Sequence, residues 1–394
     1  MILTRKQEEG LKIAVARYHA KERYTVISGY AGSGKSTLVS FIVQALGVAP
    51  EDICYCAFTG KASKILGLKT NANAITAHKL LYEFKPLPTG GFKRERKLAL
   101  EYKVIIVDEC GMLPLEMVKD LLSHRDIYVI FLGDPGQLPP ISKKDDNHLL
   151  DSPHVFLDEI MRQAQDSGII RLSMLIREGK SFDNFKSDEA IVLPSKDFVD
   201  GMLTWSDISI CATNKTRVDL NNYCRQKLGY TNVLEEGELV MNLRNNWDII
   251  TEDGEALTNG TLGTIHDIYE TFWLYPSSID VPNNRIELLC GEFTSEIGGS
   301  FGRLYFDKQM LLTGVPSLNR QQIYKIRKNK KIANQVPEEL AYGQVATCWK
   351  FQGSQANRVL GIEEGFPYDR EEHKRFLYTL VTRAIDKCVL VTKE

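Results

Sequence analysis

CxxC cysteine pairs are missing from this sequence, although Cys54 and Cys56 lie two positions apart in a strand-like run. Its eight cysteines are scattered, and no two of them form a CxxC pair. Structural zinc sites and disulfide-stapled domains both use closely spaced cysteines. The scattered positions therefore argue against both kinds of site and favour a reducing compartment.

Long apolar segments are also missing. No apolar run approaches the roughly 18 residues that a membrane-spanning helix needs. The N-terminal stretch MILTRKQEEG is charged within its first few residues, unlike a signal peptide with its apolar core. We therefore expect a cytoplasmic protein without a membrane segment.

The sequence also lacks an excess of positive or negative charge, since its formal net charge is only −2. Such a chain has no global attraction to nucleic acid or to an anionic membrane, so any site for a polyanion must be local. The sequence also lacks a second carboxylate cluster of the kind that would indicate a nuclease.

What the sequence does contain is an alternation of apolar strands and helical patterns in its first part, 1–158. Uninterrupted apolar strands between helices indicate a parallel sheet covered on both faces. Ligands of such sheets bind at the carboxyl ends of the strands. The predicted strands are YTVISGY (24–30), ICYCAFT (53–59), KVIIVDE (103–109) and IYVIFLGD (127–134).

The remainder predicts a second α/β domain with an insertion, which suits a chain of 394 residues. We assign the second domain to 159–248 and 336–394. The intervening segment 249–335 is rich in β signals, Gly and Asn. Within the first domain, 84–102 carries Pro-x-Pro and Gly-Gly and predicts a small hairpin or loop.

The stretch GYAGSGKST (29–37) follows a predicted strand and precedes a predicted helix. It fits the phosphate-binding pattern G-x-x-x-x-G-K-[ST], whose backbone N–H groups surround phosphate oxygens. Lys35 is expected to reach the β- and γ-phosphates, and the Ser36 hydroxyl to bind Mg²⁺. The nucleotide-binding residues predicted here are Gly29, Ala31, Gly32, Ser33, Gly34, Lys35, Ser36 and Thr37.

Two further strand ends supply candidate catalytic groups. VIIVDE ends in Asp108, a second Mg²⁺ ligand, and Glu109, which would orient or deprotonate the attacking water. FLGDPGQLPPI (131–141) places Gln137 after a neighbouring strand, where a neutral amide can bind the γ-phosphate or the water. A Gly-Asp-Pro-Gly turn could equally be a simple strand exit. The predicted cofactors are ATP and Mg²⁺.

These three motifs, in this order, resemble those of superfamily 1 helicases, and the resemblance extends from about residue 3 to residue 392. The branch that it resembles most contains RecD-like enzymes and phage Dda helicases. The other matching segments are LTRKQ (3–7, the Q motif), AFTGKASKIL (57–66, motif Ia), ITAHKLL (75–81), LDEIMRQ (157–163, motif IV), CATNKTRVDLN (211–221), VATCWKFQGSQ (345–355, motif V) and LYTLVTRA (377–384, motif VI).

The resemblance implies an α/β fold with two RecA-like P-loop motor domains. It adds a small pin insertion to the first domain and a small SH3-like β-barrel to the second. It assigns Gln7 to the adenine and Gly353 to the nucleotide site. Arg162 and Arg383 would reach the phosphates across the cleft between the motor domains, although isolated arginines usually form surface ion pairs.

The resemblance also implies a track for single-stranded DNA across both motor domains. Two positions depart from the family pattern: Trp349 stands where relatives often have histidine, and Phe58 where they often have proline. Each could stack on a base or pack in the interior. The predicted nucleic-acid residues are Phe58, Thr59, Lys61, His78, Phe92 at the pin, Asn214, Asn259, Thr347, Trp349 and Lys350.

One basic run lies outside the motifs. The segment PSLNRQQIYKIRKNKKIANQ (316–335) has six basic residues and no acidic one. Charge runs are usually solvated faces, so a DNA contact and a plain surface both remain open.

The function implied by the motifs and the resemblance is ATP-dependent unwinding of DNA with 5′→3′ movement on the single strand. The expected partners are single-stranded DNA, junctions of single- and double-stranded DNA, and replication or recombination proteins. We expect the enzyme to be a monomer, and its compact length is compatible with a phage-encoded protein. Two alternatives stay open: a translocase that displaces bound protein, and an ATP-switched subunit of a recombination complex.

Overall fold

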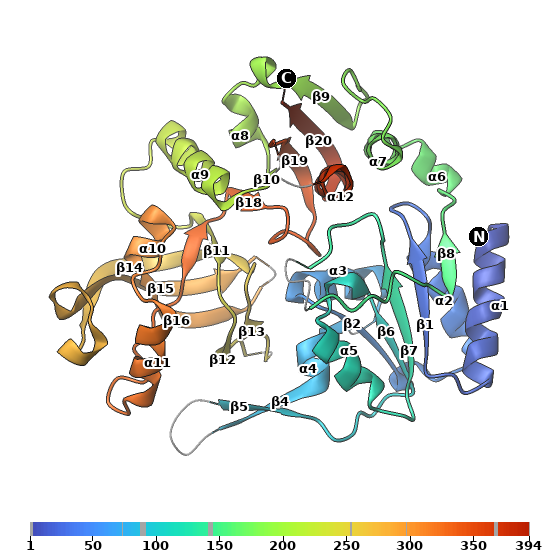
Figure 1. Ribbon diagram of the computed structural model, residues 1–394, viewed down its shortest axis with the longest axis horizontal. Helices are drawn as coiled ribbons and strands as arrows, with labels where there is room; N and C mark the ends of the chain where they lie inside the picture. The colour runs from blue at the N-terminus through green and yellow to red at the C-terminus, as the bar shows by residue number, and fades with distance from the viewer. Residues whose placement is uncertain are drawn as a thin grey trace. The chain divides into compact units, whose positions relative to one another are not determined.

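The computed structural model describes residues 3–72, 74–86, 92–140, 145–252, 254–296, 298–365 and 369–393 (Figure 1). At 84–86, 92–93, 162–163 and 247 it describes the backbone alone. The chain forms two compact units. Unit 1 comprises Met1–Glu83, Arg96–Ala212 and Phe351–Glu394, and unit 2 comprises Phe84–Glu95 and Thr213–Lys350.

The first sheet of unit 1 is entirely parallel, with the strand order β3-β2-β6-β7-β1-β8. Its central strands are apolar at almost every position, and both faces are buried. Helices α1 and α2 cover one face, and α4 and α5 cover the other. The strands are β1 (Tyr24–Gly29), β2 (Ile53–Ala57), β3 (Ala74–Thr76), β6 (Val104–Val107), β7 (Tyr128–Gly133) and β8 (Val155–Leu157).

A second parallel sheet also lies in unit 1, where β10, β19, β20 and β9 are neighbours in this order. Helices α7 and α12 contact each other beside it. The strands are β9 (Ala190–Pro194), β10 (Ile208–Cys211), β19 (Ala356–Ile362) and β20 (Ala384–Thr392).

The helices of unit 1 have the following bounds: α1 (Arg5–His19), α2 (Lys35–Leu46), α3 (Gly60–Thr70), α4 (Ala77–Leu81), α5 (Leu115–Leu122), α6 (Arg162–Gln165), α7 (Gly168–Glu178), α8 (Gly201–Trp205) and α12 (Arg370–Val381). Among the described residues, no helix is both long and apolar enough to cross a membrane.

Unit 2 is built on an antiparallel sheet with the strand order β16-β15-β14-β11-β17. One face buries Ile265, Leu289 and Phe293, and the other packs against α11 through Ile286 and Leu288. Its elements are α9 (Asn214–Leu228), β11 (Leu239–Asn242), β12 (Asn246–Ile250), β13 (Ala256–Leu257), β14 (Leu262–Leu274), β15 (Arg285–Ser295), β16 (Ser300–Asp307), α10 (Lys308–Thr313), α11 (Arg320–Lys328), β17 (Leu340–Tyr342) and β18 (Val345–Thr347).

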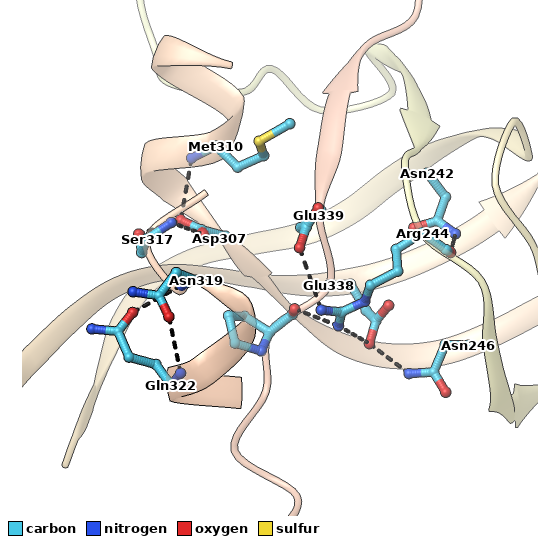
Figure 2. Close-up of polar contacts among 11 residues, drawn as sticks. Asn242, Arg244, Asn246, Asp307, Met310, Ser317, Asn319, Gln322, Glu338 and Glu339 are labelled. Carbon is cyan, nitrogen blue, oxygen red and sulfur yellow. Dashed lines mark hydrogen bonds and ion pairs between the residues drawn. The ribbon is translucent and has the colours of Figure 1, made fainter. Parts of the chain in front are cut away.

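A polar network ties the start of β12 to the segment before β17 (Figure 2). The carboxylate of Glu338, which is 3% exposed, accepts a hydrogen bond of 2.6 Å from Asn246 Nδ2 and pairs with Arg244 at 3.5 Å. Arg244 also donates to Pro337 O at 2.9 Å. Burial raises the pKa of Glu338, while the Arg244 charge lowers it. The network therefore compensates a buried carboxylate inside unit 2.

The predicted parallel strands of the first part are confirmed within a few residues of the expected bounds. The hairpin expected near 84–102 corresponds to β4 (Tyr82–Pro86) and β5 (Phe92–Arg96), which form a two-stranded sheet. The compact units divide the chain differently from the predicted boundaries at 158, 248 and 335, since unit 1 holds the first parallel sheet together with β9, β10, β19 and β20. Those boundaries stay a prediction.

Candidate nucleotide and nucleic-acid sites

The phosphate-binding loop leaves β1 and enters α2. Gly32 and Gly34 both have φ of 78°, a left-handed conformation that glycine adopts at little cost. Lys35 Nζ donates to Gly29 O at 2.5 Å and to Tyr30 O at 3.2 Å, so the ammonium is folded back over the loop. Ser36 and Thr37 lie in the first turn of α2.

An unsatisfied group inside this loop fits a phosphate. Ser33 is 2% exposed, and its Oγ has no hydrogen-bond partner among the described residues. A buried hydroxyl without a partner is costly, and a phosphate oxygen would satisfy it. The loop geometry therefore agrees with the predicted nucleotide site.

Asp108 and Glu109 follow β6, and Gln137 follows β7, which lies between β6 and β1 in the sheet. Glu109 has φ of 51°, and its N–H donates to Asp108 Oδ1 at 3.0 Å. Gln137 Nε2 lies 3.4 Å from Glu109 Oε1. The structure thus brings the Asp108–Glu109 pair and Gln137 together at one edge of the sheet, as the parallel topology requires.

The electrostatics of this edge favour a bound cation. Burial, and then the charge of Glu109, raise the pKa of Asp108, while the charge of Lys35 lowers it. Among the described residues, no group of three or more His, Cys, Asp or Glu side chains could hold a metal ion. Mg²⁺ usually takes one or two carboxylates with phosphates and waters, so the donor set of Asp108 and Ser36 fits it.

Tyr378 of α12 is a site residue that the sequence reading missed. Its hydroxyl accepts a hydrogen bond of 2.8 Å from the Ala31 N–H of the phosphate-binding loop and donates one of 2.7 Å to Asp134 Oδ2. Asp134 Oδ1 in turn accepts from Gly136 N–H at 2.9 Å. Burial raises the pKa of both Tyr378 and Asp134. One buried hydroxyl therefore joins the phosphate-binding loop to the segment that carries Gln137.

Two more hydrogen bonds hold that segment. Leu138 N–H donates to Thr379 Oγ1 at 2.9 Å, and Gln352 Nε2 donates to Leu138 O at 2.7 Å. A cavity of about 260 Å³ opens beside it, with Glu109, Gln137 and Arg375 among its lining residues. Arg375 was not predicted; the sequence signal was its position on α12, the helix that ends just before Arg383.

Arg383 and Arg162 are the two arginines predicted to reach the phosphates, and the structure describes the side chain of Arg383 alone. Arg383 is 3% exposed, and its guanidinium donates to Thr379 O at 3.0 Å and to Ser354 O at 3.3 Å. Arg162 begins α6, but its side chain lies outside the described residues. The roles of both stay predictions.

Gln7 and Gly353 lie in well-defined surroundings. Gln7 is 1% exposed; its Oε1 accepts from Thr4 N–H at 3.0 Å in a capping box, and its Nε2 donates to Ser33 O at 3.3 Å. Gly353 has φ of 70°, and a Cβ there would lie 3.3 Å from Thr59 Oγ1. Gln7 thus contacts the phosphate-binding loop directly, whereas Gly353 lies against the motif Ia segment.

Four of the predicted nucleic-acid residues are grouped in unit 1. The rings of Phe58 and His78 lie 5.6 Å apart, and Phe58 also packs against the core beneath α4 and α5. Thr59 caps α3 by accepting from Ala62 N–H at 3.2 Å. Lys61 Nζ lies 5.2 Å from the Phe351 ring centroid.

Two of the predicted residues of unit 2, Asn214 and Lys350, line a cavity of about 450 Å³ together with Arg217, which was not predicted. Arg217 Nε donates to Asn214 Oδ1 at 3.3 Å. Burial, and then the charge of Arg217, lower the pKa of Lys350 to about 8. A Cβ at Gly260, next to Asn259, would lie 3.0 Å from Lys350 O.

Three further residues were predicted to contact nucleic acid: Thr347, Trp349 and Phe92. Thr347 is 3% exposed, and its carbonyl accepts from Lys350 N–H at 3.0 Å, so its side chain belongs to the interior. Trp349 is half-buried. Phe92 lies in β5, but its side chain is outside the described residues.

A phosphate-binding loop, an Asp-Glu pair and a glutamine at adjacent ends of a parallel sheet define a P-loop nucleotide-binding protein. Two family models match the chain: an AAA domain over residues 3–191 and a UvrD-like helicase C-terminal domain over residues 342–391. These two matches confirm the resemblance to superfamily 1 helicases that the sequence motifs carry.

Individual relatives agree with this assignment. RecD2 DNA helicase of Deinococcus radiodurans is 31% identical over 169 residues, covering 41% of this chain and 23% of that protein. The dda helicase of Enterobacteria phage T4 is 32% identical over 149 residues, covering 35% and 33%. An uncharacterised Acanthamoeba polyphaga mimivirus protein, R530, is 38% identical over 166 residues, covering 34% and 33%. The matches thus span a third or less of each relative.

Solved structures show the same fold at lower identity. Bacteroides Pif1 bound to single-stranded DNA superposes with a TM-score of 0.51 and 17% identity, covering 99% of this chain and 92% of that one. Bacteroides Pif1 with ADP-AlF3 and single-stranded DNA gives 0.50 and 15%, covering 100% and 92%. With the two parallel sheets, this likeness establishes a two-domain RecA-like helicase fold.

Proposed function

We propose that this chain is an ATP-dependent DNA helicase that moves 5′→3′ on single-stranded DNA and unwinds duplex. The observation that carries the proposal is the convergence of Lys35, Glu109 and Gln137 at neighbouring strand ends of the first sheet. The named activities of RecD2, dda and the Pif1 structures support DNA as the substrate.

In the proposed mechanism, the loop amides and Lys35 bind the phosphates of ATP. Ser36 and Asp108 would hold Mg²⁺, which would supply positive charge for the phosphoryl group. Glu109 orients or deprotonates the attacking water, and the Gln137 amide binds the water or the γ-phosphate. Arg162, Arg375 and Arg383 are the candidates for stabilising the transition-state charge.

Coupling to movement would pass through the segment that follows β7. Gln137 is adjacent to Leu138, whose backbone is held by Thr379 and Gln352. A shift of Gln137 on loss of the γ-phosphate would therefore be transmitted to α12 and to the segment before β19. This is the physical role that we assign to the GDPGQLPP segment.

The DNA-binding part of the proposal uses both residue groups described above. In unit 1 it involves Phe58, Thr59, Lys61 and His78, and in unit 2 Asn214, Asn259, Trp349 and Lys350. The β4–β5 hairpin would act as the pin that separates the strands. The antiparallel sheet of unit 2 would correspond to the SH3-like insertion. The 5′→3′ direction rests on the resemblance to RecD-like and Dda helicases.

The test is ATP hydrolysis with and without single-stranded oligo-dT, followed by unwinding of forks that carry 5′ or 3′ tails. Strong stimulation by oligo-dT, lost in Glu109→Gln, and unwinding of the 5′-tailed fork support the proposal. Stimulation without unwinding would favour the protein-displacing translocase. ATP binding without any stimulation would overturn the motor and favour the ATP-switched subunit.

A further inference from the structure

Helix α11 of unit 2 carries a stripe of one aromatic and three basic side chains. Arg320, Tyr324, Arg327 and Lys328 are spaced i, i+4, i+7 and i+8, which places them on one face of an α-helix. All four are exposed, and Tyr324 is 60% exposed. We refer to these four residues as the α11 stripe.

The opposite face anchors the helix firmly. Ile326 is fully buried in an apolar cluster with Ile279, Leu318 and Ile332, and Ile323 packs against it. The stripe is therefore presented by a fixed helix and not by a loose segment.

The start of α11 is also held in place, as Figure 2 shows. Asn319 Oδ1 accepts from Gln322 N–H at 3.0 Å, while Asn319 N–H donates to Gln322 Oε1 at 2.8 Å in a capping box. Two residues before Asn319, Ser317 Oγ donates to Asp307 Oδ1 at 2.6 Å. These contacts fix the direction in which α11 leaves β16 and α10.

The charges of the stripe are not neutralised within the described part of the chain. None of its three cations forms an ion pair there, and no acidic residue occurs between positions 316 and 335. Lys328 Nζ lies 4.5 Å from the Tyr324 ring centroid. Cations in the last turn, such as Arg327 and Lys328, stabilise a helix through its dipole. Arg320, however, is the first helical residue, where the dipole disfavours a positive charge, so helix stability does not account for it.

We propose that the α11 stripe is a binding site for single-stranded DNA, separate from the motor motifs. Its chemistry is that of sequence-independent single-strand binding, in which cations contact phosphates and an exposed aromatic ring stacks on a base. Arg320 and Arg327 are ~10 Å apart along the helix axis, so they can contact different phosphates of one strand. Because the chain as a whole carries a net charge of only −2, such a local surface decides where a polyanion binds.

The choice of DNA as the polyanion rests on the proposed helicase function. The experiment measures binding of fluorescent oligo-dT by anisotropy over a series of salt concentrations, without ATP. It compares the full chain with the triple variant R320Q/R327Q/K328Q and with Y324A. The matched control is K12Q/K119Q/R125Q, which removes the same charge from exposed positions on unit 1.

The triple variant should lower the slope of log affinity against log salt by about 2, since each lost phosphate contact on a single strand contributes about 0.7. Y324A should weaken binding about tenfold, and Y324F should restore it. The control should match the unsubstituted chain in both slope and affinity. Equal losses in the control and the triple variant, or no loss in either, would overturn the proposal.

A hairpin duplex serves as a second probe. A larger loss of affinity for the duplex than for oligo-dT would replace the single-strand assignment with a duplex surface and so contradict the proposal. The ATPase of the unsubstituted chain separates the two hypotheses. Stimulation by oligo-dT together with normal binding by the α11 variants would refute the stripe alone, whereas absent stimulation would refute the motor.

Discussion

Around the phosphate-binding loop of unit 1, charged and polar groups are buried and joined to one another, whereas the cations of the α11 stripe in unit 2 are exposed and form no ion pair among the described residues. Asp134 and Tyr378 are almost fully buried and share a hydrogen bond, while Arg320 and Arg327 face solvent. At the buried site, each polar group needs a hydrogen-bond partner at the right distance and angle, because a buried polar group without a partner is costly. Exposure makes the second site tolerant of geometry and sensitive to salt.

The largest effect is expected at the strand ends of unit 1. Glu109→Gln should lower ATP hydrolysis by roughly 10²–10⁴-fold, because it removes the group that orients or deprotonates water. Lys35→Ala should weaken nucleotide binding itself. Steady-state hydrolysis and nucleotide titration measure the two effects. The control is Glu101→Gln at an exposed position; hydrolysis by Glu109→Gln at the level of this control would contradict the assigned role.

Tyr378→Phe tests whether the buried hydroxyl positions the site or only packs. The substitution leaves Ala31 N–H and Asp134 Oδ2 without a shared partner, at a cost of about 1–3 kcal/mol. We expect kcat/KM for ATP to fall about tenfold and the melting temperature to fall as well. Tyr30→Phe is the matched control, since its ring lies 6.5 Å from that of Tyr378. A lower melting temperature with unchanged kcat/KM would leave Tyr378 a purely structural role.

Two arginines of the same region should respond differently to the same substitution. Arg383→Gln should lower the free energy of unfolding by about 1–3 kcal/mol, because buried carbonyl groups lose their donors. Arg375→Gln should leave stability unchanged and lower kcat, because Arg375 lines the cavity beside Glu109. Thermal unfolding and steady-state kinetics on both variants provide the measurement. An unchanged kcat in Arg375→Gln would contradict a catalytic role for Arg375.

The smallest effect concerns pH and Lys350. Its folded-state pKa of about 8 lies below the ordinary 10.5, so the ammonium loses its proton as pH rises through about 8. The affinity for oligo-dT should therefore fall a few-fold between about pH 7 and pH 9. Lys350→Arg should remove this pH dependence, because arginine stays protonated.

The same shift has a consequence for stability. Burial of the charged ammonium opposes folding below about pH 8, and this cost is relieved as pH rises toward 10.5. Urea unfolding of the unsubstituted chain and of Lys350→Met, each at neutral and at alkaline pH, measures it. Parallel curves for the two proteins would be inconsistent with the shifted pKa.

The parts of the site that the sequence predicted are local or follow from sheet topology. The strand β1, the loop and helix α2 are continuous in the chain, and the left-handed Gly32 and Gly34 reflect the motif itself. Asp108 and Gln137 could be brought together because carboxyl ends of parallel strands share one edge. Tyr378 could not be found in this way, since its bond to Ala31 joins residues 347 positions apart.

By itself, the sequence determined the P-loop, the Asp-Glu pair, the family resemblance and the helical spacing of the α11 stripe, because these depend on neighbouring residues. Only the tertiary structure decided that Tyr378 contacts the phosphate-binding loop, that Arg383 donates to backbone carbonyls, and that Lys350 lies beside Arg217. The physical reason is that burial and hydrogen-bond partners come from packing between distant segments, which no local pattern records.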